Sequence, residues 1–168
     1  KHIFLRMVHL MLAIHFLLAI GSYQGKYPLT KTCIRDDRII GAWSMKELDH
    51  HYDIFLNDYF YEVKHRITKK NEGKIYISKV NNTYMMNLLD ENGEYMYAKY
   101  DFNNQGDLVI TAIDGSYDDG TGTLLQNKKF DSQTDFLNFF INNHEKSTFF
   151  SETFEAHFKK IKPRGGRD

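Results

Sequence analysis

The chain has 168 residues, with 22 basic and 22 acidic side chains and a single cysteine. This length favours one domain. Because basic residues are not in excess, the composition argues against a general nucleic-acid-binding protein, which needs a positive face. A lone cysteine provides no intrachain disulfide, so we expect a core that is stable without covalent cross-links.

The first 21 residues are typical of a secretory signal peptide. Lys1 and Arg6 precede an apolar run from Met7 to Ile20, and small residues end at Gly21, where a signal peptidase would cut. The apolar run is too short, and with two histidines too polar, to span a bilayer comfortably. We therefore predict a signal peptide over residues 1–21, a secreted or periplasmic protein, and no membrane-spanning segment in the mature chain.

Residues 22–38 are predicted to be an N-terminal spacer, and residues 163–168 a basic tail. The spacer contains Cys33, which lies well beyond Gly21 behind a charged stretch. A lipid-anchored cysteine would directly follow the apolar run, so we interpret Cys33 as a free thiol. Asn81 begins an Asn-x-Thr sequon, which has meaning only if the source is eukaryotic.

From residue 39 onward, short segments rich in aromatic and β-branched residues alternate with turns rich in Asn, Asp and Gly. These turn residues tolerate the positive φ that tight hairpins require. Regular spacing of such segments is typical of an antiparallel meander, sandwich or barrel. We expect strands near residues 39–48, 57–68, 73–80, 83–90, 94–102, 107–114 and 121–130.

Two of these segments show a clear period of two, which places alternate residues on one face of a sheet. The residues expected on the core face are Tyr61, Val63, His65, Met96, Ala98 and Tyr100. Tyr95 and Tyr97 lie on the opposite face of their strand. They are therefore the best candidates for contact with a protein partner.

The pattern changes after residue 131. Residues 132–143 have apolar residues at helical spacing, with Ser132 or Thr134 as a natural N-cap. A second amphipathic segment, residues 147–161, has phenylalanines at near-helical steps. The predicted fold class is mainly β, an antiparallel meander of about six to eight strands in a barrel or strongly curved sheet. One or two C-terminal helices complete a single domain over residues 39–162.

The pair Gly41 and Trp43, at the start of the first strand and behind a signal peptide, resembles the opening motif of the lipocalins and the wider calycin group. The resemblance implies an up-and-down barrel whose base is closed by the tryptophan and whose interior holds a small hydrophobic ligand. The implied ligand-binding residues are Trp43, Tyr61, Val63, His65, Met96, Ala98 and Tyr100. The alternative is that Trp43 is an ordinary core residue at a strand start.

One lipocalin feature has no direct match. In that family an arginine from a late strand stacks on the tryptophan, whereas this chain has no arginine between Arg66 and Arg164. The partner is therefore missing, or it is replaced by Lys128 or Lys129.

The densest polar cluster is Asp49 to Asp53, with His50 and His51 side by side. His51 and Asp53 would share one strand face and could hold a metal with a third ligand. We interpret the cluster instead as an exposed loop that joins the first two strands. His65 either orients a ligand or is a hydrogen-bonded core histidine. Residues 114–125 lack the glycine and the bidentate glutamate of a calcium loop.

No nucleophile motif, P-loop or dinucleotide fingerprint is present, so we expect no catalytic residue, no metal site and no cofactor. The leading hypothesis is a secreted, lipocalin-like protein that binds a small hydrophobic ligand in its interior. The alternative is a secreted protein–protein or carbohydrate interaction module with a filled core. A ligand-binding barrel predicts a cavity of roughly 300 Å³ or more, whereas an interaction module predicts none.

Overall fold

The computed structural model describes residues 21–45 and 50–162, with only the backbone of His50 and of residues 152–154. The predicted signal peptide, apart from Gly21, and the basic tail therefore lie outside the described residues.

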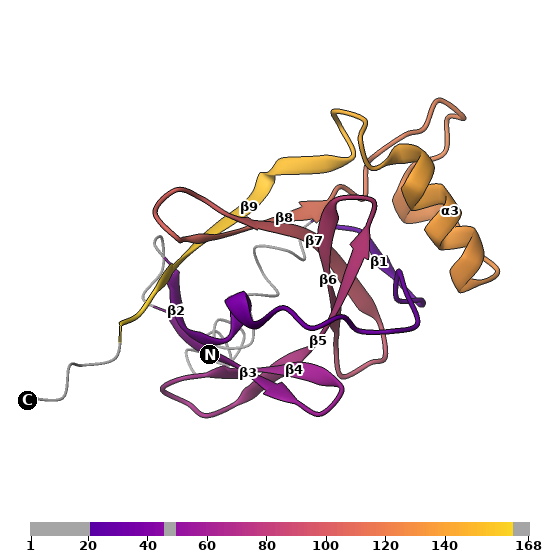
Figure 1. Ribbon diagram of the computed structural model, residues 1–168. Helices are drawn as coiled ribbons and strands as arrows, with labels where there is room; N and C mark the ends of the chain where they lie inside the picture. The colour runs from indigo at the N-terminus through magenta and orange to yellow at the C-terminus, as the bar shows by residue number, and fades with distance from the viewer. Residues whose placement is uncertain (1–20, 46–49, 163–168) are drawn as a thin grey trace, which may run out of the picture.

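Eight antiparallel strands form a closed barrel (Figure 1). From β2 to β8 each strand pairs with the next along the chain, and β9 pairs with both β8 and β2 to complete the ring. The strands are β2 (Gly41–Met45), β3 (His50–Asn57), β4 (Phe60–His65), β5 (Asn71–Val80), β6 (Thr83–Leu89), β7 (Tyr95–Phe102), β8 (Leu108–Ile113) and β9 (Phe150–Lys160).

Four further elements lie outside this ring. They are the two-residue strand β1 (Gln24–Gly25), which pairs with the start of β7, the 3-10 turns η1 (Asp37–Ile39) and η2 (Leu125–Asn127), and helix α3 (Gln133–Asn143). The predicted fold class, a mainly β meander barrel with a C-terminal helix, is confirmed. Six of the seven expected strands are present. Asn81, the first residue of the sequon, lies on the surface in the β5–β6 turn, with φ +50°.

The strand expected over residues 121–130 is wrong, and a strand was missed at 50–57. Residues 121–130 contain η2 and otherwise irregular backbone. The polar cluster interpreted as an exposed loop instead forms β3, with Tyr52 and Ile54 buried and His51 and Asp53 on the other face. The alternation of Tyr52, Ile54 and Leu56 was a strand signal that the neighbouring charged residues obscured.

The second C-terminal helix is also wrong, because residues 150–160 form β9. Phenylalanines four residues apart lie on one face of a helix, but an even spacing also keeps them on one face of a strand. Ala156 and Phe158 of β9 are buried in the barrel core. The barrel needs this strand to bridge β8 and β2, and that long-range requirement cannot be seen in the local pattern.

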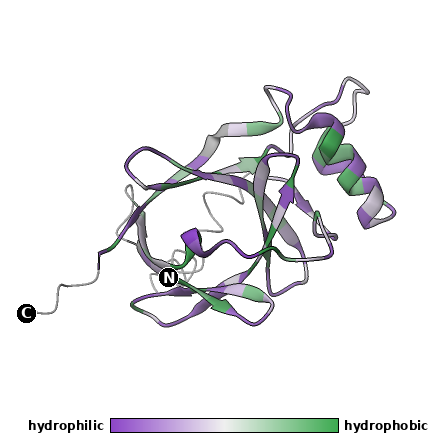
Figure 2. Cartoon of the chain, in the orientation of Figure 1, coloured by the Kyte–Doolittle hydropathy of each residue, from purple (hydrophilic) through white to green (hydrophobic). Residues whose placement is uncertain are grey.

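Helix α3 packs on the outside of the barrel (Figure 1). Its predicted N-cap is confirmed, since the Ser132 side chain accepts a hydrogen bond from the Asp135 N–H. Phe136 and Phe140 pack with Tyr97 and Phe149 in a second core, separate from the barrel interior. Figure 2 shows hydrophobic and hydrophilic positions alternating along strands and helix, as expected for elements with one buried face.

The segment before β2 packs along the barrel. The Leu29 N–H donates to the Asn87 side chain, and the Ile34 N–H donates to the Ile77 carbonyl. Cys33 is a free thiol whose sulfur accepts from the Ile77 N–H at 3.1 Å, and burial raises the pKa of this thiol. These contacts lead the chain from β1 along the barrel to η1.

Turn η1 is fixed against the barrel by a polar cluster around Asp36. The Arg38 guanidinium donates to both carboxylate oxygens, at 2.8 and 2.7 Å, and the Tyr100 hydroxyl donates to one of them at 2.7 Å. The Asp36 N–H donates to the Tyr61 hydroxyl at 2.7 Å. The hydrogen bonds from Arg38 and Tyr100 lower the pKa of Asp36. Two tyrosines that point into the barrel thus hold η1 at its end.

Replacing Asp36 with Asn should destabilise the protein by about 2 kcal/mol at pH 7, because charge-assisted bonds to Arg38 and Tyr100 are lost. The folded pKa of Asp36 lies below its ordinary value of 3.8. The contribution of the Asp36 carboxylate to the stability of the fold is therefore present above pH 3.8 and is lost as the pH falls through the folded pKa. Denaturant unfolding at several pH values should show the difference between D36N and wild type narrowing in acid.

The matched control is Asp37→Asn. Asp37 also pairs with an arginine, Arg35, but both side chains are more than half exposed, so the loss should stay below about 1 kcal/mol. An equal effect of the two substitutions would contradict the anchoring role of Asp36.

Candidate functional site

The seven residues implied as ligand-binding all lie in the barrel interior or its wall. Each is at most 4% exposed, and six belong to one hydrophobic cluster, which His65 joins through its ring contact with Tyr52. Trp43, Met96 and Ala98 line the space that remains at the centre. The face assignments made from the sequence therefore agree with the structure.

The space enclosed by these side chains is small. The central cavity measures about 30 Å³. Its lining is apolar and includes Tyr52, Met86 and Phe158, whose side chains fill the barrel from three strands. Pockets for small molecules usually measure about 300–1,000 Å³. The interior is thus packed as a core.

Trp43 lies at the end of the barrel that η1 covers. Its indole N–H donates to the Ile39 carbonyl at 2.9 Å. The ammonium of Lys160, on the last strand, lies 5.5 Å from the ring centroid. The two lysines predicted to replace the lipocalin arginine lie elsewhere. Lys128 lies over Phe139 and pairs with Asp119, and Lys129 lines a surface hollow with Tyr27. A cation from the closing strand therefore covers the tryptophan.

The end of β4 carries a more polar group of side chains. The His65 ring meets Tyr52 edge-to-face at 5.5 Å, and its Nδ1 accepts from the Thr68 N–H at 3.3 Å. Burial, and secondly the charge of Glu72, raises the pKa of Tyr52. Burial also raises the pKa of Glu72, against the opposing charge of Lys70. His65 has the bond expected of a core histidine.

The cluster at residues 49–53 does not assemble a metal site in the part of the chain that the structure describes. His51 and Asp53 share a face of β3 as expected, while Asp49 lies outside the described residues. Across residues 21–45 and 50–162, no three side chains of His, Cys, Asp or Glu are grouped closely enough to hold a metal ion.

The outer surface offers more space than the interior. A groove of about 790 Å³ runs over the outer face of β7, β8 and β9, between the β5–β6 hairpin and the segment that follows α3. Its side chains are mostly polar, with both signs of charge. The lining residues are Arg38, Asn82, Thr83, Tyr84, Lys99, Tyr100, Asp101, Val109, Thr111, His144, Glu145, Lys146, Ser147, Phe150 and Glu155.

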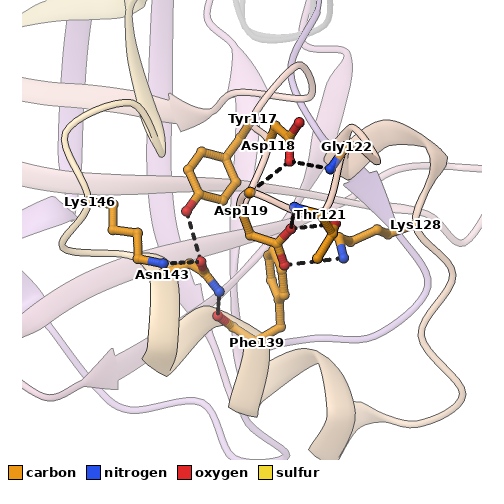
Figure 3. A network of polar contacts seen from close by, with 10 residues as sticks. Tyr117, Asp118, Asp119, Thr121, Gly122, Lys128, Phe139, Asn143 and Lys146 are labelled. Atoms are coloured by element: carbon orange, nitrogen blue, oxygen red, sulfur yellow. Dashed lines mark hydrogen bonds and ion pairs between the residues drawn. The ribbon is translucent and has the colours of Figure 1, made fainter.

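One wall of this groove is held by a hydrogen-bonded network at the end of α3 (Figure 3). The Asn143 amide donates to the Phe139 carbonyl, while its oxygen accepts from the Tyr117 hydroxyl at 2.8 Å and from Lys146 at 3.1 Å. The loop after Tyr117 is closed by Asp118, which accepts from the Gly122 N–H. The wall is therefore built on rigid elements.

Two side chains that line the groove, those of His144 and Lys99, also contact neighbouring protein groups. His144 is buried, and since carbonyls only accept, its Nδ1–H must donate to the Phe140 carbonyl at 3.0 Å. Lys99 lies 4.6 Å from the centroid of the Phe150 ring. Sequence reasoning missed this groove because its residues come from Arg38 to Glu155 and share no local motif.

Of the two residues expected to contact a partner, only Tyr95 is partly accessible. Tyr97 is 1% exposed, packed against Phe136 and stacked on Tyr23. Its strand face is outward, as expected, but helix α3 and the N-terminal segment cover it. Tyr97 therefore presents no surface to a partner.

Comparison of the chain with the profiles of known families, with curated proteins and with solved structures gives no match. Within the described residues, no helix combines the length and apolar character needed to cross a membrane.

A filled interior makes a direct prediction for Ala98, which lines the central cavity. Replacement by Phe should destabilise the protein by about 1–3 kcal/mol because the core has no room for the ring, and replacement by Val should cost less. Denaturant unfolding of both variants measures this. Unchanged stability of A98F would reveal a larger interior space than 30 Å³.

Glu72 gives a second prediction. Because burial raises its folded pKa, its charged form weakens the fold above its ordinary value of 4.5, and the penalty vanishes below that value. Glu72→Gln should therefore raise stability at pH 7 and leave it unchanged at pH 4 or below. Glu94→Gln, at an exposed position, is the control. A destabilising effect of E72Q at pH 7 would show that the carboxylate contributes to the fold.

Proposed function

We propose that this protein is an exported, non-catalytic binding module that acts through its outer surface, with the closed barrel as a rigid scaffold. The observation that carries this proposal is the contrast between an interior cavity of about 30 Å³ and an outer groove of about 790 Å³. Export is supported by the order of basic residues, apolar run and small residues over 1–21.

The groove is suited to a polar partner, either a segment of protein or a carbohydrate. Lys99, Lys146 and Arg38 supply donors, while Asp101, Glu145 and Glu155 supply acceptors, so the lining has no strong excess of either charge. Such a surface makes many hydrogen bonds without attracting one sign of charge.

A lipocalin-like role, with a small hydrophobic ligand inside the barrel, is the second candidate. It is supported by the closed eight-stranded barrel, the Gly41–Trp43 opening and the cation over the tryptophan. A ligand of ordinary size would need Met86 and Met96 to move aside. Methionine is flexible enough for such a rearrangement, but the cost of opening a packed core weighs against it.

NMR on protein labelled at the methionine methyls and uniformly with 15N separates the two candidates. Met45, Met86 and Met96 lie in the barrel core, and Met85 lies in the second core outside it. We expect fatty acids and retinoids to leave the three interior methyl signals unchanged. A peptide or oligosaccharide that binds should instead shift backbone amide signals of Lys99, Thr111 and His144. Saturable shifts of the Met86 and Met96 methyls with a fatty acid would favour the lipocalin-like role.

A further inference from the structure

A second hollow lies at the end of the barrel that η1 covers. It measures about 670 Å³ and is formed by the β7–β8 turn and the end of β9. The turn contributes Gln105, Gly106 and Asp107, and the strand end contributes Lys159, Lys160, Ile161 and Lys162. We call this hollow the basic end. It is separate from the groove on the outer face of β7–β9.

The three lysines of the basic end are exposed and make no ion pair with a carboxylate of the described residues. The Lys160 ammonium lies over the Trp43 ring. The one carboxylate in the hollow belongs to Asp107, which is buried and accepts from the Asn103 side chain at 3.3 Å. Three exposed lysines thus line one hollow to which the described residues contribute a single, buried carboxylate.

Charged residues are also unevenly distributed along the sequence. Residues 159–168 contain five basic side chains, with Arg164 and Arg167 after the lysines, and a single acidic one, Asp168. Residues 22–158 contain 15 basic and 21 acidic side chains. The mature chain is therefore an acidic body with one basic end, and that charge separation favours an anion at this place and disfavours one elsewhere.

We propose that the basic end binds phosphate groups. A phosphate carries more than one charge and several acceptor oxygens, so it can accept from more than one lysine, whereas a carboxylate offers one charge on two oxygens. The source is either a free phosphate compound or the headgroups of an anionic phospholipid surface. Both share the same recognition chemistry.

The test uses two probes on the full chain at low salt: inorganic pyrophosphate, and vesicles of phosphatidylglycerol compared with phosphatidylcholine. Trp43, the single tryptophan, reports on pyrophosphate because Lys160 lies over its ring. Replacing Lys159, Lys160 and Lys162 with Gln should weaken binding to phosphatidylglycerol vesicles by about 100-fold, since each lysine near an anionic surface contributes about 1 kcal/mol.

The matched control replaces three exposed lysines elsewhere, Lys26, Lys31 and Lys129, with Gln and should retain binding. A double variant, K159Q/K162Q, leaves the Lys160–Trp43 contact intact and guards against a loss of folding. Binding of pyrophosphate identifies a free phosphate compound as the source, and binding of anionic vesicles alone identifies lipid headgroups. The proposal is overturned if neither probe binds, or if the control weakens binding as much as the basic-end variants.

Discussion

Closure of the sheet is the constraint on which the rest of the structure depends. Seven strands from β2 to β8 form a meander that would leave two open edges, and β9 satisfies both by pairing with β8 and β2. An eight-stranded ring leaves an interior just wide enough for side chains to fill or for one small ligand. Here large side chains such as Trp43, Tyr52 and Phe158 take that space, so the closed ring encloses a packed core.

Closure of the barrel also determines which segments pack on its outer surface. The chain between β8 and β9 cannot enter a filled barrel, so α3 packs on its outer face and buries Tyr97 in a second core. The same segment returns the chain past His144 and forms one wall of the outer groove. At the covered end, Asp36 and Arg38 fix η1 while Lys160 of the closing strand lies over Trp43. The surfaces available for binding are consequences of how the ring is completed.

Local patterns were enough to predict most of the barrel. Alternation identified the core faces of β4 and β7, and Ser132 correctly marked the start of α3. The two misassigned strands have different causes. The alternation of β3, which pairs with its chain neighbours β2 and β4, was obscured by charged residues, whereas β9 is defined by partners far away in the sequence. His50–Asp53 looked like a loop until Tyr52 is seen to pair with both Trp43 and His65. The phenylalanines of β9 fit a helix until the open edges of β2 and β8 are considered.

The site was harder to predict than the fold. The residues expected to line a pocket do face inward, but their sequence pattern carries no information on how much space they leave. That depends on the conformations of Met86, Met96 and their neighbours at the centre of the ring. The outer groove and the basic end likewise combine residues from several strands and turns. Lys159 to Lys162 alone form a local signal, but Lys159 and Lys160 were assigned to the predicted second helix.

The central claim is that the barrel interior is a core and not a ligand pocket. Native mass spectrometry of the protein from a native-like host, followed by organic extraction, tests it most directly. The account predicts the mass of the chain alone and an extract without a stoichiometric apolar compound. A co-purified apolar molecule at one per chain, lost when Ala98 is replaced by Phe in a folded variant, would contradict it.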